Sequence, residues 1–512
     1  MNIQLVNPPV YLNVHAMTAL RPSMPLGLAY IAASLRREGH ELSVIDAVAE
    51  APEQVTSEGR IHRLGLTPDE IIARLDPDAD AFAVTNMWSF SWPLVREILQ
   101  KIKEARPDAD LVCGGEHFTG LPEFSLKQAP IDYIVVGEGD EAAVELFAAL
   151  EDGTPVDDVA GLVFQRDGEI VRTGKRARTT AIDELPWPAW DLFDIDTYNK
   201  YDLVTGLHAG MTVPILATRG CPYSCTYCSS PNMWTTKYVT REPVDVADEI
   251  EFYYRHRGAR NFPFQDLTAI VKRNWIIEFC TELLDRGLTG ITWQFPSGTR
   301  CEVIDDEVAS LLLRSGGRAL AFAPESGSER TRKLIKKRMK TESLYDAVEA
   351  SVRNKLNITA FLVIGFPHDE PGDLRATRSL VRKLAIMGID DIAIGFFFPI
   401  PNTELYYQLR ERGDVQLDDE FLLTPIFAND EKLMAENNYC DHMSARQLTF
   451  WKYRLLINFY GLSFATRPWR IGTILLNTLR GRETRKLETF LVELKRKSLV
   501  WVKGRRAAEA AS

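Results

Sequence analysis

The sequence predicts an α/β protein with an N-terminal doubly wound, Rossmann-like domain, a partial (β/α)6 barrel and a helical C-terminal region. The chain of 512 residues is too long for one ordinary hydrophobic core. Short apolar runs alternate with amphipathic helical stretches in two separate parts of the chain, and the last part shows helical periodicity alone. We therefore expect a first domain at residues 1–152, a linker with a hairpin at 153–199, the barrel at 200–413 and the helical region at 414–512.

The first domain is expected to begin with an apolar strand at residues 3–6, which two prolines at positions 8 and 9 end. An amphipathic helix at 26–37 follows, and further strands are predicted at 41–45, 81–84, 111–113 and 133–136. In such sheets ligands bind beyond the carboxyl ends of the strands. The candidate loops are Asn7-Pro8-Pro9, Asn86-Met87-Trp88-Ser89, Gly114-Gly115-Glu116-His117 and Gly137-Glu138-Gly139-Asp140.

Repeated strand and helix units return after the linker, whose predicted hairpin turns at Asp167-Gly168. The expected barrel strands are residues 214–217, 261–264, 292–294, 320–322, 359–364 and 393–398. Strands of this kind with intervening helices form a full or partial barrel, whose active face lies at the carboxyl ends of the strands. That face is therefore the second place where we expect a site.

Composition excludes several classes of protein. A formal net charge of −11 argues against nucleic acid as the main partner, because phosphate binding needs a basic surface. No stretch approaches the roughly eighteen apolar residues of a membrane span. The N-terminal residues do not resemble a secretion signal, so we expect a cytoplasmic protein. Seven cysteines without a pairing pattern indicate reduced thiols.

Three cysteines share one loop directly after the first barrel strand. Cys221, Cys225 and Cys228 are separated by three and two residues. Thiolates are soft ligands suited to iron–sulfur clusters, and three of them leave one iron of a four-iron cluster open. Zinc would require a fourth ligand, and the next histidine is distant at His256, although structural zinc or free thiols remain alternatives. The other cysteines are interpreted as buried thiols: Cys113, Cys280, Cys301 and Cys440.

The pattern Cys-x-x-x-Cys-x-aromatic-Cys resembles the signature loop of radical S-adenosylmethionine (SAM) enzymes. The resemblance extends to residues 293–300, 324–328, 361–367 and 398–406, which are similar to later strands of the subfamily with an N-terminal cobalamin-binding domain. That subfamily includes magnesium-protoporphyrin cyclase-like and methylase-like proteins, and the likeness covers roughly residues 1–410. It implies a [4Fe-4S] cluster, SAM bound to the open iron, a 5′-deoxyadenosyl radical, and a reductant such as flavodoxin or ferredoxin.

The resemblance also assigns contacts to SAM. Tyr227 would present its backbone to the adenine, and Glu325 with Ser326 would hold the ribose or the methionine end. Further expected cofactor contacts are Arg300, Gln265 and Gly365. Relatives often carry Asp-Asp after the second strand, where this chain has Gln265-Asp266. Two plainer interpretations stay open: Glu325 caps the following helix, and Arg300 forms a surface ion pair.

The resemblance places cobalamin on the first domain. Glycines in its loops let the backbone approach a bulky corrin closely. The expected cobalamin contacts are Trp88, Ser89, Gly114, Gly115, Glu116, His117, Gly137, Glu138 and Gly139. The Asp-x-His-x-x-Gly pattern of histidine-ligated cobalt is absent, and His15 lacks its context, so we expect no histidine on cobalt. Trp88 would then pack under the corrin, or merely fill a contact between domains.

The resemblance predicts methylation of an unactivated carbon on a lipid, a pigment precursor or a secondary metabolite. One SAM would methylate cobalamin, a second would supply the radical, and the substrate radical would take the methyl group. Radical cyclisation, rearrangement or carbon–carbon coupling is the alternative within the same chemistry. A noncatalytic cobalamin or redox sensor is the alternative from another class.

The C-terminal segment is basic on an acidic protein. Residues 466–506 hold about a dozen Lys and Arg against three Glu, beside apolar, aromatic stretches at 450–460 and 466–480. Such helices can lie peripherally on the anionic inner membrane surface, with Arg467, Arg470, Arg480 and Arg482 as contacts. They can equally be structural helices packed on the barrel. Membrane contact would suit an apolar substrate.

Overall fold

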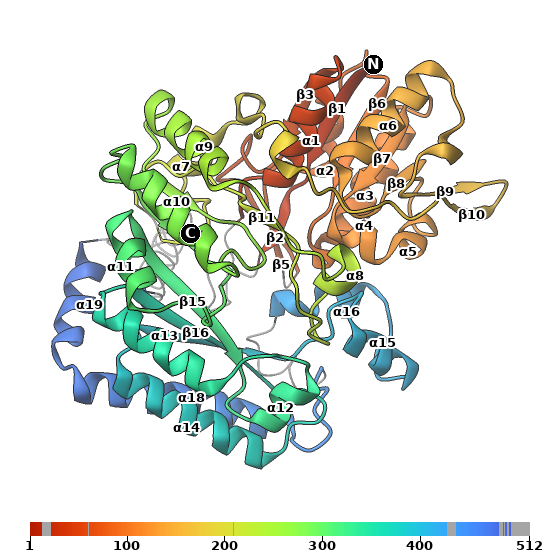
Figure 1. The fold of residues 1–512 in the computed structure, drawn as a ribbon. Coiled ribbons are helices and arrows are strands. Elements are labelled where there is room, and N and C mark those ends of the chain that lie inside the picture. The colour runs from red at the N-terminus through yellow and green to blue at the C-terminus, as the bar shows by residue number, and fades with distance from the viewer. Residues whose placement is uncertain are drawn as a thin grey trace, which may run out of the picture.

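The computed structural model describes residues 1–12, 22–59, 61–207, 209–427 and 437–480, together with 485, 487–488 and 491–492. Two α/β units stand side by side, and of the C-terminal helices α18 lies beneath the second unit and α19 at its outer side (Figure 1). The predicted fold class, a doubly wound domain followed by a partial barrel and a helical region, is confirmed.

The first unit is built on a seven-stranded sheet with the order β10-β9-β8-β7-β6-β1-β3. Its parallel strands are β1 (Asn2–Asn7), β3 (Glu41–Asp46), β6 (Ala81–Thr85), β7 (Asp110–Gly114) and β8 (Tyr133–Val135). Four consecutive residues of β1 are buried, as expected for a strand covered by helices on both faces. The main covering helices are α1 (Leu26–Arg37), α3 (Trp92–Ala105) and α6 (Gly139–Asp152).

The predicted hairpin exists but is not part of a free linker. Strands β9 (Leu162–Arg166) and β10 (Glu169–Arg172) turn at Asp167-Gly168, and β9 pairs antiparallel with β8. The sheet of the first unit therefore extends past the boundary expected at residue 152.

A small antiparallel sheet of β2 (Val10–Leu12), β5 (Ile61–Leu64) and β4 (Val55–Glu58) was not anticipated from the sequence. Short helices complete the first unit: α2 (Pro68–Ile72), α4 (Glu116–Gly120) and α5 (Pro122–Leu126).

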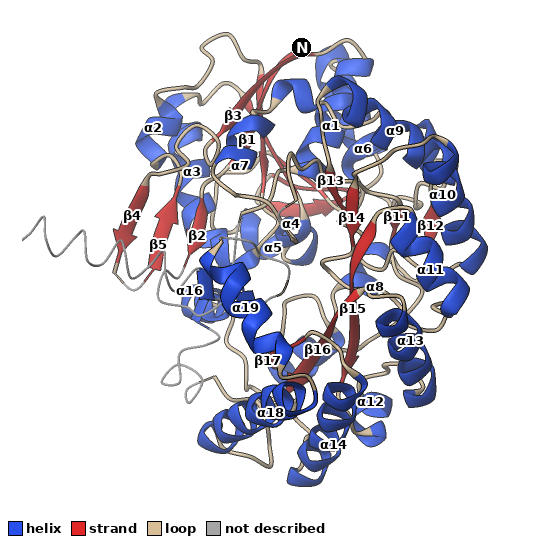
Figure 2. Ribbon diagram, turned by 90° about the vertical axis from the view of Figure 1, so that its left-hand side faces the viewer, coloured by secondary structure: helices blue, strands red, loops and turns tan. Residues whose placement is uncertain are grey.

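The second unit is an open barrel of five consecutive parallel strands (Figure 2). They are β13 (Asn261–Pro263), β14 (Thr292–Gln294), β15 (Gly317–Glu325), β16 (Asn357–Ile364) and β17 (Asp391–Phe396). The expected first strand at 214–217 forms no continuous ladder. This part of the chain makes only two isolated bridges, from Thr212 to Asn261 of β13 and from Ile215 to Phe264 directly after β13. A two-stranded pair, β11 (Thr218–Arg219) and β12 (Val239–Thr240), follows it.

The barrel helices are α9 (Pro243–His256), α10 (Arg273–Asp285), α11 (Asp306–Arg314), α13 (Thr341–Arg353) and α14 (Pro371–Met387). Shorter helices lie in the connections: α7 (Ile195–Lys200), α8 (Ser230–Trp234), α12 (Glu329–Leu334), α15 (Glu404–Glu411) and α16 (Asp419–Leu423).

The C-terminal region contains α18 (Ala445–Thr466) and α19 (Trp469–Leu479). Helix α18 starts at a capping box in which the Ser444 hydroxyl accepts from the backbone of Gln447. It packs along α14 and buries Leu448, Trp451 and Leu455. Among the helices that the structure describes, none is both long and apolar enough to cross a membrane.

Candidate active site

The three cysteines lie on the loop between β11 and α8, where the strand ends of the barrel face the first unit. Gly220 opens this loop with φ +84°, and a Cβ there would overlap the Lys237 carbonyl oxygen, so glycine is required. The Thr226 N–H donates to the Ile335 carbonyl (3.1 Å), and the Thr226 carbonyl accepts from the Leu405 N–H (2.9 Å). The loop is thus held from both sides by backbone bonds to α12 and α15.

The three thiols of the loop are free to act as ligands. Cys221, Cys225 and Cys228 are free and half-buried. In the described parts of the chain, no three His, Cys, Asp or Glu side chains converge as ligands of one metal ion would. Thr226 Oγ1 in the loop and Ser230 Oγ beside it are buried and have no hydrogen-bond partner among the described residues. Their hydroxyls are therefore available to donate a hydrogen bond to a sulfide of a bound cluster.

The thiols would have to lose protons to bind iron. Burial raises the pKa of Cys228 to about 12, and burial raises the pKa of Cys225 as well. Metal binding at such thiols releases protons and is coupled to the folding of the loop. The donor set of three free, soft thiols therefore fits the implied [4Fe-4S] cluster.

Glu325 lies at the carboxyl end of β15, beside the cysteine loop. It is buried and has φ +61°, a left-handed conformation that is costly for a residue with a Cβ and that clusters at functional sites. Its Oε1 accepts hydrogen bonds from the Tyr227 hydroxyl (2.8 Å) and from Lys337 Nζ (3.0 Å). Although burial opposes it, the Glu325 carboxylate raises the pKa of Lys337, so this lysine stays charged. The helix-capping interpretation of Glu325 is wrong, because Ser328 caps α12.

The other residues expected to contact SAM are distributed around this carboxylate. Arg300 is buried rather than on the surface; it pairs with Glu302, and its guanidinium lies 4.0 Å from the centroid of the Tyr223 ring. Arg300 and Lys337 line a small cavity against β15. Gln265 Nε2 donates to Thr205 Oγ1. The contacts of all these residues with SAM stay predictions.

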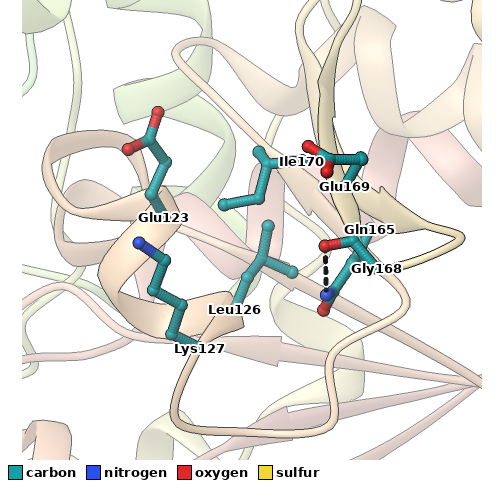
Figure 3. Close-up of a pocket in the computed structure, with 7 residues that line it drawn as sticks. All are labelled: Glu123, Leu126, Lys127, Gln165, Gly168, Glu169 and Ile170. Carbon is teal, nitrogen blue, oxygen red and sulfur yellow. Dashed lines mark hydrogen bonds between the residues drawn. The ribbon is translucent and has the colours of Figure 1, made fainter.

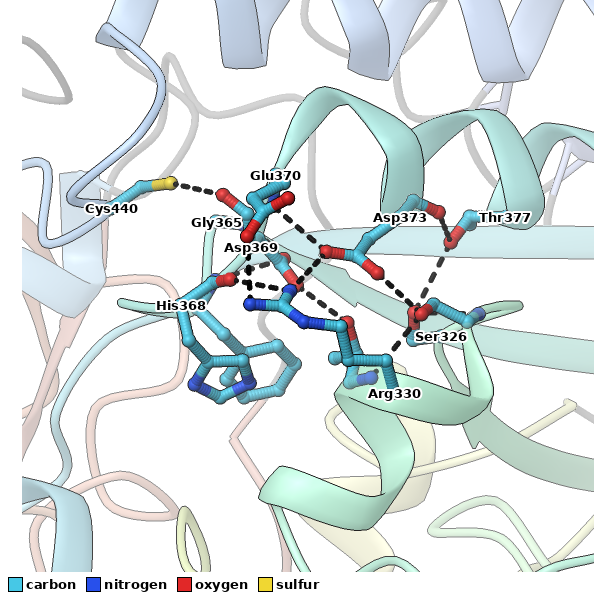
Figure 4. A network of polar contacts seen from close by, with 12 residues as sticks. Ser326, Arg330, Gly365, His368, Asp369, Glu370, Asp373, Thr377 and Cys440 are labelled. Carbon is cyan, nitrogen blue, oxygen red and sulfur yellow. Dashed lines mark hydrogen bonds and ion pairs between the residues drawn. The ribbon is translucent and has the colours of Figure 1, made fainter.

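Ser326 and Gly365 belong to a polar network that joins the ends of β15 and β16 (Figure 4). Ser326 Oγ meets Thr377 Oγ1 at 3.2 Å, and the Gly365 N–H donates to the Asp369 carboxylate (3.0 Å). Burial raises the pKa of Asp369 to about 6. Cys440 Sγ donates to the Asp369 carbonyl at 3.3 Å, so the C-terminal segment closes this side of the site. The four cysteines outside the loop are buried, as predicted.

On the first unit, His117 is buried and bonded through both ring nitrogens. Its Nδ1 lies 3.0 Å from Ser89 Oγ, its Nε2 lies 3.2 Å from Ser125 Oγ, and its ring stacks on Trp92 at 4.7 Å. Burial lowers the pKa of His117 to about 3, so the ring is neutral. The imidazole of His117 is therefore occupied inside the domain, and the absence of a histidine on cobalt stays a prediction. His15 lies outside the described residues.

Other residues at this end of the first-unit sheet leave exposed or unpaired groups that a bulky ligand could contact. Trp88 is 57% exposed and stacks on Phe90, so it does not fill a domain contact as the plainer interpretation had it. Asn86 Nδ2 is buried and has no partner among the described residues. Gly137 has φ +85° and open space where a side chain would be. Gly115 has φ +109°, and a Cβ there would meet the Asn86 carbonyl oxygen at 2.7 Å, which requires glycine for packing.

Of the remaining predicted loop residues, two acidic ones reach toward the cysteine segment and two glycines pack inside the first unit. Glu116 accepts a hydrogen bond from Ser229, the residue after Cys228. Glu138 pairs with Arg178 at 2.6 Å. Gly139 packs against Ile31 of α1, and Gly114 approaches the Val135 carbonyl oxygen.

Sequence reasoning missed two cations at the contact between the units, Arg178 and Arg219, and a third beside Glu325 in the barrel, Lys337. No motif marks the two arginines, because their partners lie 40 and 79 residues away in the sequence.

A separate hollow lies between α5 and the β9–β10 hairpin, at the outer edge of the first unit (Figure 3). Its charged side chains are of both signs, Glu123, Lys127 and Glu169, and a Gln165–Gly168 hydrogen bond of 3.0 Å crosses its rim. We assign this hollow no role.

Known proteins match both units. The B12 binding domain model matches residues 14–147, and the Radical SAM superfamily model matches residues 215–381. An uncharacterized methyltransferase of Pyrococcus horikoshii is 28% identical over 410 residues, which cover 79% of this chain and 82% of the relative. An anaerobic magnesium-protoporphyrin IX monomethyl ester cyclase of Synechocystis is 27% identical over 424 residues, which cover 82% of this chain and 79% of the relative.

A solved structure shares the fold. The cobalamin-dependent S-adenosylmethionine radical enzyme OxsB superposes with a TM-score of 0.68 at 14% identity, covering 98% of this chain and 80% of that one. The cysteine loop and Glu325 fall inside the second matched segment, and the glycine loops fall inside the first. The chain therefore belongs to the radical SAM enzymes that carry an N-terminal cobalamin-binding domain, and its cofactors are a [4Fe-4S] cluster, SAM and cobalamin.

Proposed function

We propose that this enzyme transfers a methyl group to an unactivated carbon of a small, largely apolar molecule, such as a lipid, a pigment precursor or a secondary metabolite. The observation that carries the proposal is the direct contact of the two sites: loops 114–117 and 137–140 of the cobalamin-binding domain touch the residues on either side of the three cysteines. When bound, SAM on the cluster supplies a hydrogen-abstracting radical, and cobalamin supplies the methyl group.

The chain's own residues hold the reactants and exclude water. The three cysteines hold the cluster. Glu325, fixed by Tyr227 and Lys337, binds polar groups of SAM, and its burial strengthens those hydrogen bonds. Trp88 presents an exposed aromatic face to the corrin. The electron comes from a reductant such as flavodoxin or ferredoxin, and we expect the reaction in the cytoplasm.

The test is anaerobic turnover of the reconstituted enzyme with methyl-labelled SAM, cobalamin and dithionite. Methylation predicts two products, S-adenosylhomocysteine from methyl donation and 5′-deoxyadenosine from radical formation. Cys225→Ala should abolish the deoxyadenosine but leave the adenosylhomocysteine. Formation of deoxyadenosine with no protein-dependent adenosylhomocysteine would rule methyl transfer out.

Cyclisation, rearrangement or coupling is the second candidate, favoured by the 27% identity to a cyclase. It uses the same radical and predicts deoxyadenosine without adenosylhomocysteine, so the same assay separates the two. The sensor alternative is set aside, because the domain matches identify an enzyme.

We also propose that α19 contacts an anionic membrane surface when the enzyme meets an apolar substrate. Five large apolar side chains of α19 are exposed: Trp469, Ile471, Leu475, Leu476 and Leu479. Residues 480–506 add ten Lys and Arg against three Glu. One part of the earlier expectation is wrong: Arg467 and Arg470 are not membrane contacts, since they bind carbonyl groups at the end of α14.

A further inference from the structure

We infer that Arg219 and Asp140 are positioning residues that fix the cysteine loop against the cobalamin-binding face and so set the separation between cluster and corrin. The inference rests on the presence of the two cofactors and not on which product the enzyme makes. It can therefore fail while methylation holds, and the reverse is also true.

Arg219 enters the cysteine loop from β11, two residues before Cys221. Its Nη1 and Nη2 bind the two oxygens of Asp140 at 2.5 and 3.0 Å. Asp140 lies in the first turn of α6, directly after the loop Gly137-Glu138-Gly139. Both side chains are less than one tenth exposed, and the Arg219 guanidinium also lies 5.4 Å from the Tyr30 ring of α1.

Glu138 connects this pair to the other end of the loop. Its Oε1 lies 3.6 Å from Arg219 Nη1, and its Oε2 accepts from Arg178 Nε at 2.6 Å. Arg178 in turn donates to the carbonyls of Trp234 and Lys237, on the chain that leaves α8. The carboxylate therefore contacts the strand before the cysteines and, through Arg178, the segment after them.

A third contact lies beside the last cysteine. The Ser229 hydroxyl donates to Glu116, from the loop 114–117 of the first unit. Arg219 and Ser229 thus hold the two ends of the cysteine loop. Their partners, Asp140 and Glu116, both belong to the cobalamin-binding face of the first unit. The barrel holds the middle of the loop through Thr226, and the first unit holds both of its ends.

The free energy of folding does not explain why this position holds a charged pair. A buried ion pair seldom exceeds an apolar contact of the same shape in net stabilisation, because both charges lose their water. What a forked, bidentate Arg–carboxylate pair adds is direction, since two parallel bonds fix the angle as well as the distance. This argues for a role in alignment rather than in folding.

The test measures the magnetic interaction between the cofactors in the holoenzyme. Cobalt(II) is prepared in the bound cobalamin, and its paramagnetic relaxation is compared with the cluster oxidised and reduced. In the native protein, reduction of the cluster should speed cobalt relaxation. Arg219→Met and Asp140→Asn should each lose at least half of that enhancement, with iron and cobalamin contents unchanged.

The double variant Asp140→Asn/Arg219→Met separates alignment from stability. It leaves no unpaired charge, so it should regain native stability to urea, yet the enhancement should remain lost. Asp390→Asn is the matched control, because it disrupts a buried pair with Arg470 away from the domain contact and should keep the full enhancement. Native enhancement in the double variant, or an equal loss in Asp390→Asn, would overturn the inference.

Discussion

Lys337 brings an ammonium group to the buried side of the cysteine loop. It bonds to Glu325, and its charge interacts with Cys225. A nearby positive charge favours the reduced, more negative state of an iron–sulfur cluster. We therefore predict that Lys337→Met lowers the midpoint potential by on the order of 50 mV, which is slightly less than a tenfold change for a one-electron couple.

The potential is measured by redox titration followed by paramagnetic resonance. The matched control is Lys336→Met, because the Lys336 side chain is half exposed and pairs with Glu404 on the other side. Equal shifts in the two variants would mean that the effect is not specific to the buried ammonium.

His117 should make the first unit sensitive to acid. Its pKa is about 3 when folded against an ordinary value near 6.5, so the unfolded chain binds more protons between these values. Stability is thus intact above pH 6.5 and falls with pH below it, by about 2 kcal/mol at pH 5.

The measurement is urea unfolding at pH 7 and pH 5. His117→Gln should remove this part of the slope, while Asp46, Asp266 and Asp369, whose folded pKa values are raised to about 6, contribute equally in both proteins. An unchanged slope would show that the imidazole is not held neutral.

We also predict that paramagnetic resonance of cobalt(II) in the bound cobalamin shows no nitrogen splitting from an imidazole, because both ring nitrogens of His117 are bonded inside the first unit.

At the scale of elements, α18 and α19 are attached to α14 by arginines. Arg470 donates to the carbonyls of Gly388 (2.7 Å) and Ile389 (2.7 Å) and approaches Asp390 at 3.3 Å. We predict that Arg470→Gln destabilises the protein by about 2–4 kcal/mol, because buried acceptors lose a charged donor.

Urea unfolding checks this value, with Arg480→Gln as the control. Arg480 is exposed at the end of α19, so its replacement should stay within about 0.5 kcal/mol. If both variants lower the free energy of unfolding by the same amount, Arg470 is not a structural contact, and a membrane contact of Arg470 is again the better interpretation.

The sequence predicted the elements that local pattern determines. The runs at 3–6 and 41–45 match β1 and β3 to within a residue at either end, and the helix at 26–37 matches α1. Strand β4 escaped notice because its residues alternate between exposed and half-buried, with no apolar run. The segment 214–217 is apolar enough for a strand, but only tertiary context decides that it forms bridges rather than a ladder.

The candidate site divides in the same way. The three cysteines are recognisable because their spacing is local, and Glu325 is recognisable from its motif. Arg219 could not be linked to Asp140, because 79 residues separate them and their pairing depends on how the two units dock.

At the scale of the whole molecule, the exposed apolar face of α19 should bind membranes reversibly. Each basic residue near an anionic surface contributes about 1 kcal/mol, and the buried apolar side chains add to this. We predict that the protein sediments with anionic phosphatidylserine vesicles at low salt and is released at high salt. Trp469→Ser/Leu475→Ser/Leu479→Ser should bind at least fivefold more weakly.

Val55→Ser is the control, because it removes an exposed apolar side chain on the first unit and should bind as the native protein does. If the triple variant also binds natively, or if the native protein ignores anionic vesicles, α19 is only part of the fold.

The central claim is that the loop of Cys221, Cys225 and Cys228 holds the cluster that cleaves SAM. The most direct measurement is iron content and 5′-deoxyadenosine formation of anaerobically reconstituted protein, compared with Cys225→Ala and with Cys280→Ala, a buried thiol of α10. The native protein and Cys280→Ala should hold about four irons per chain and form deoxyadenosine, whereas Cys225→Ala should lose both. Stoichiometric zinc without iron in the native protein, or native iron and cleavage in Cys225→Ala, would contradict the claim.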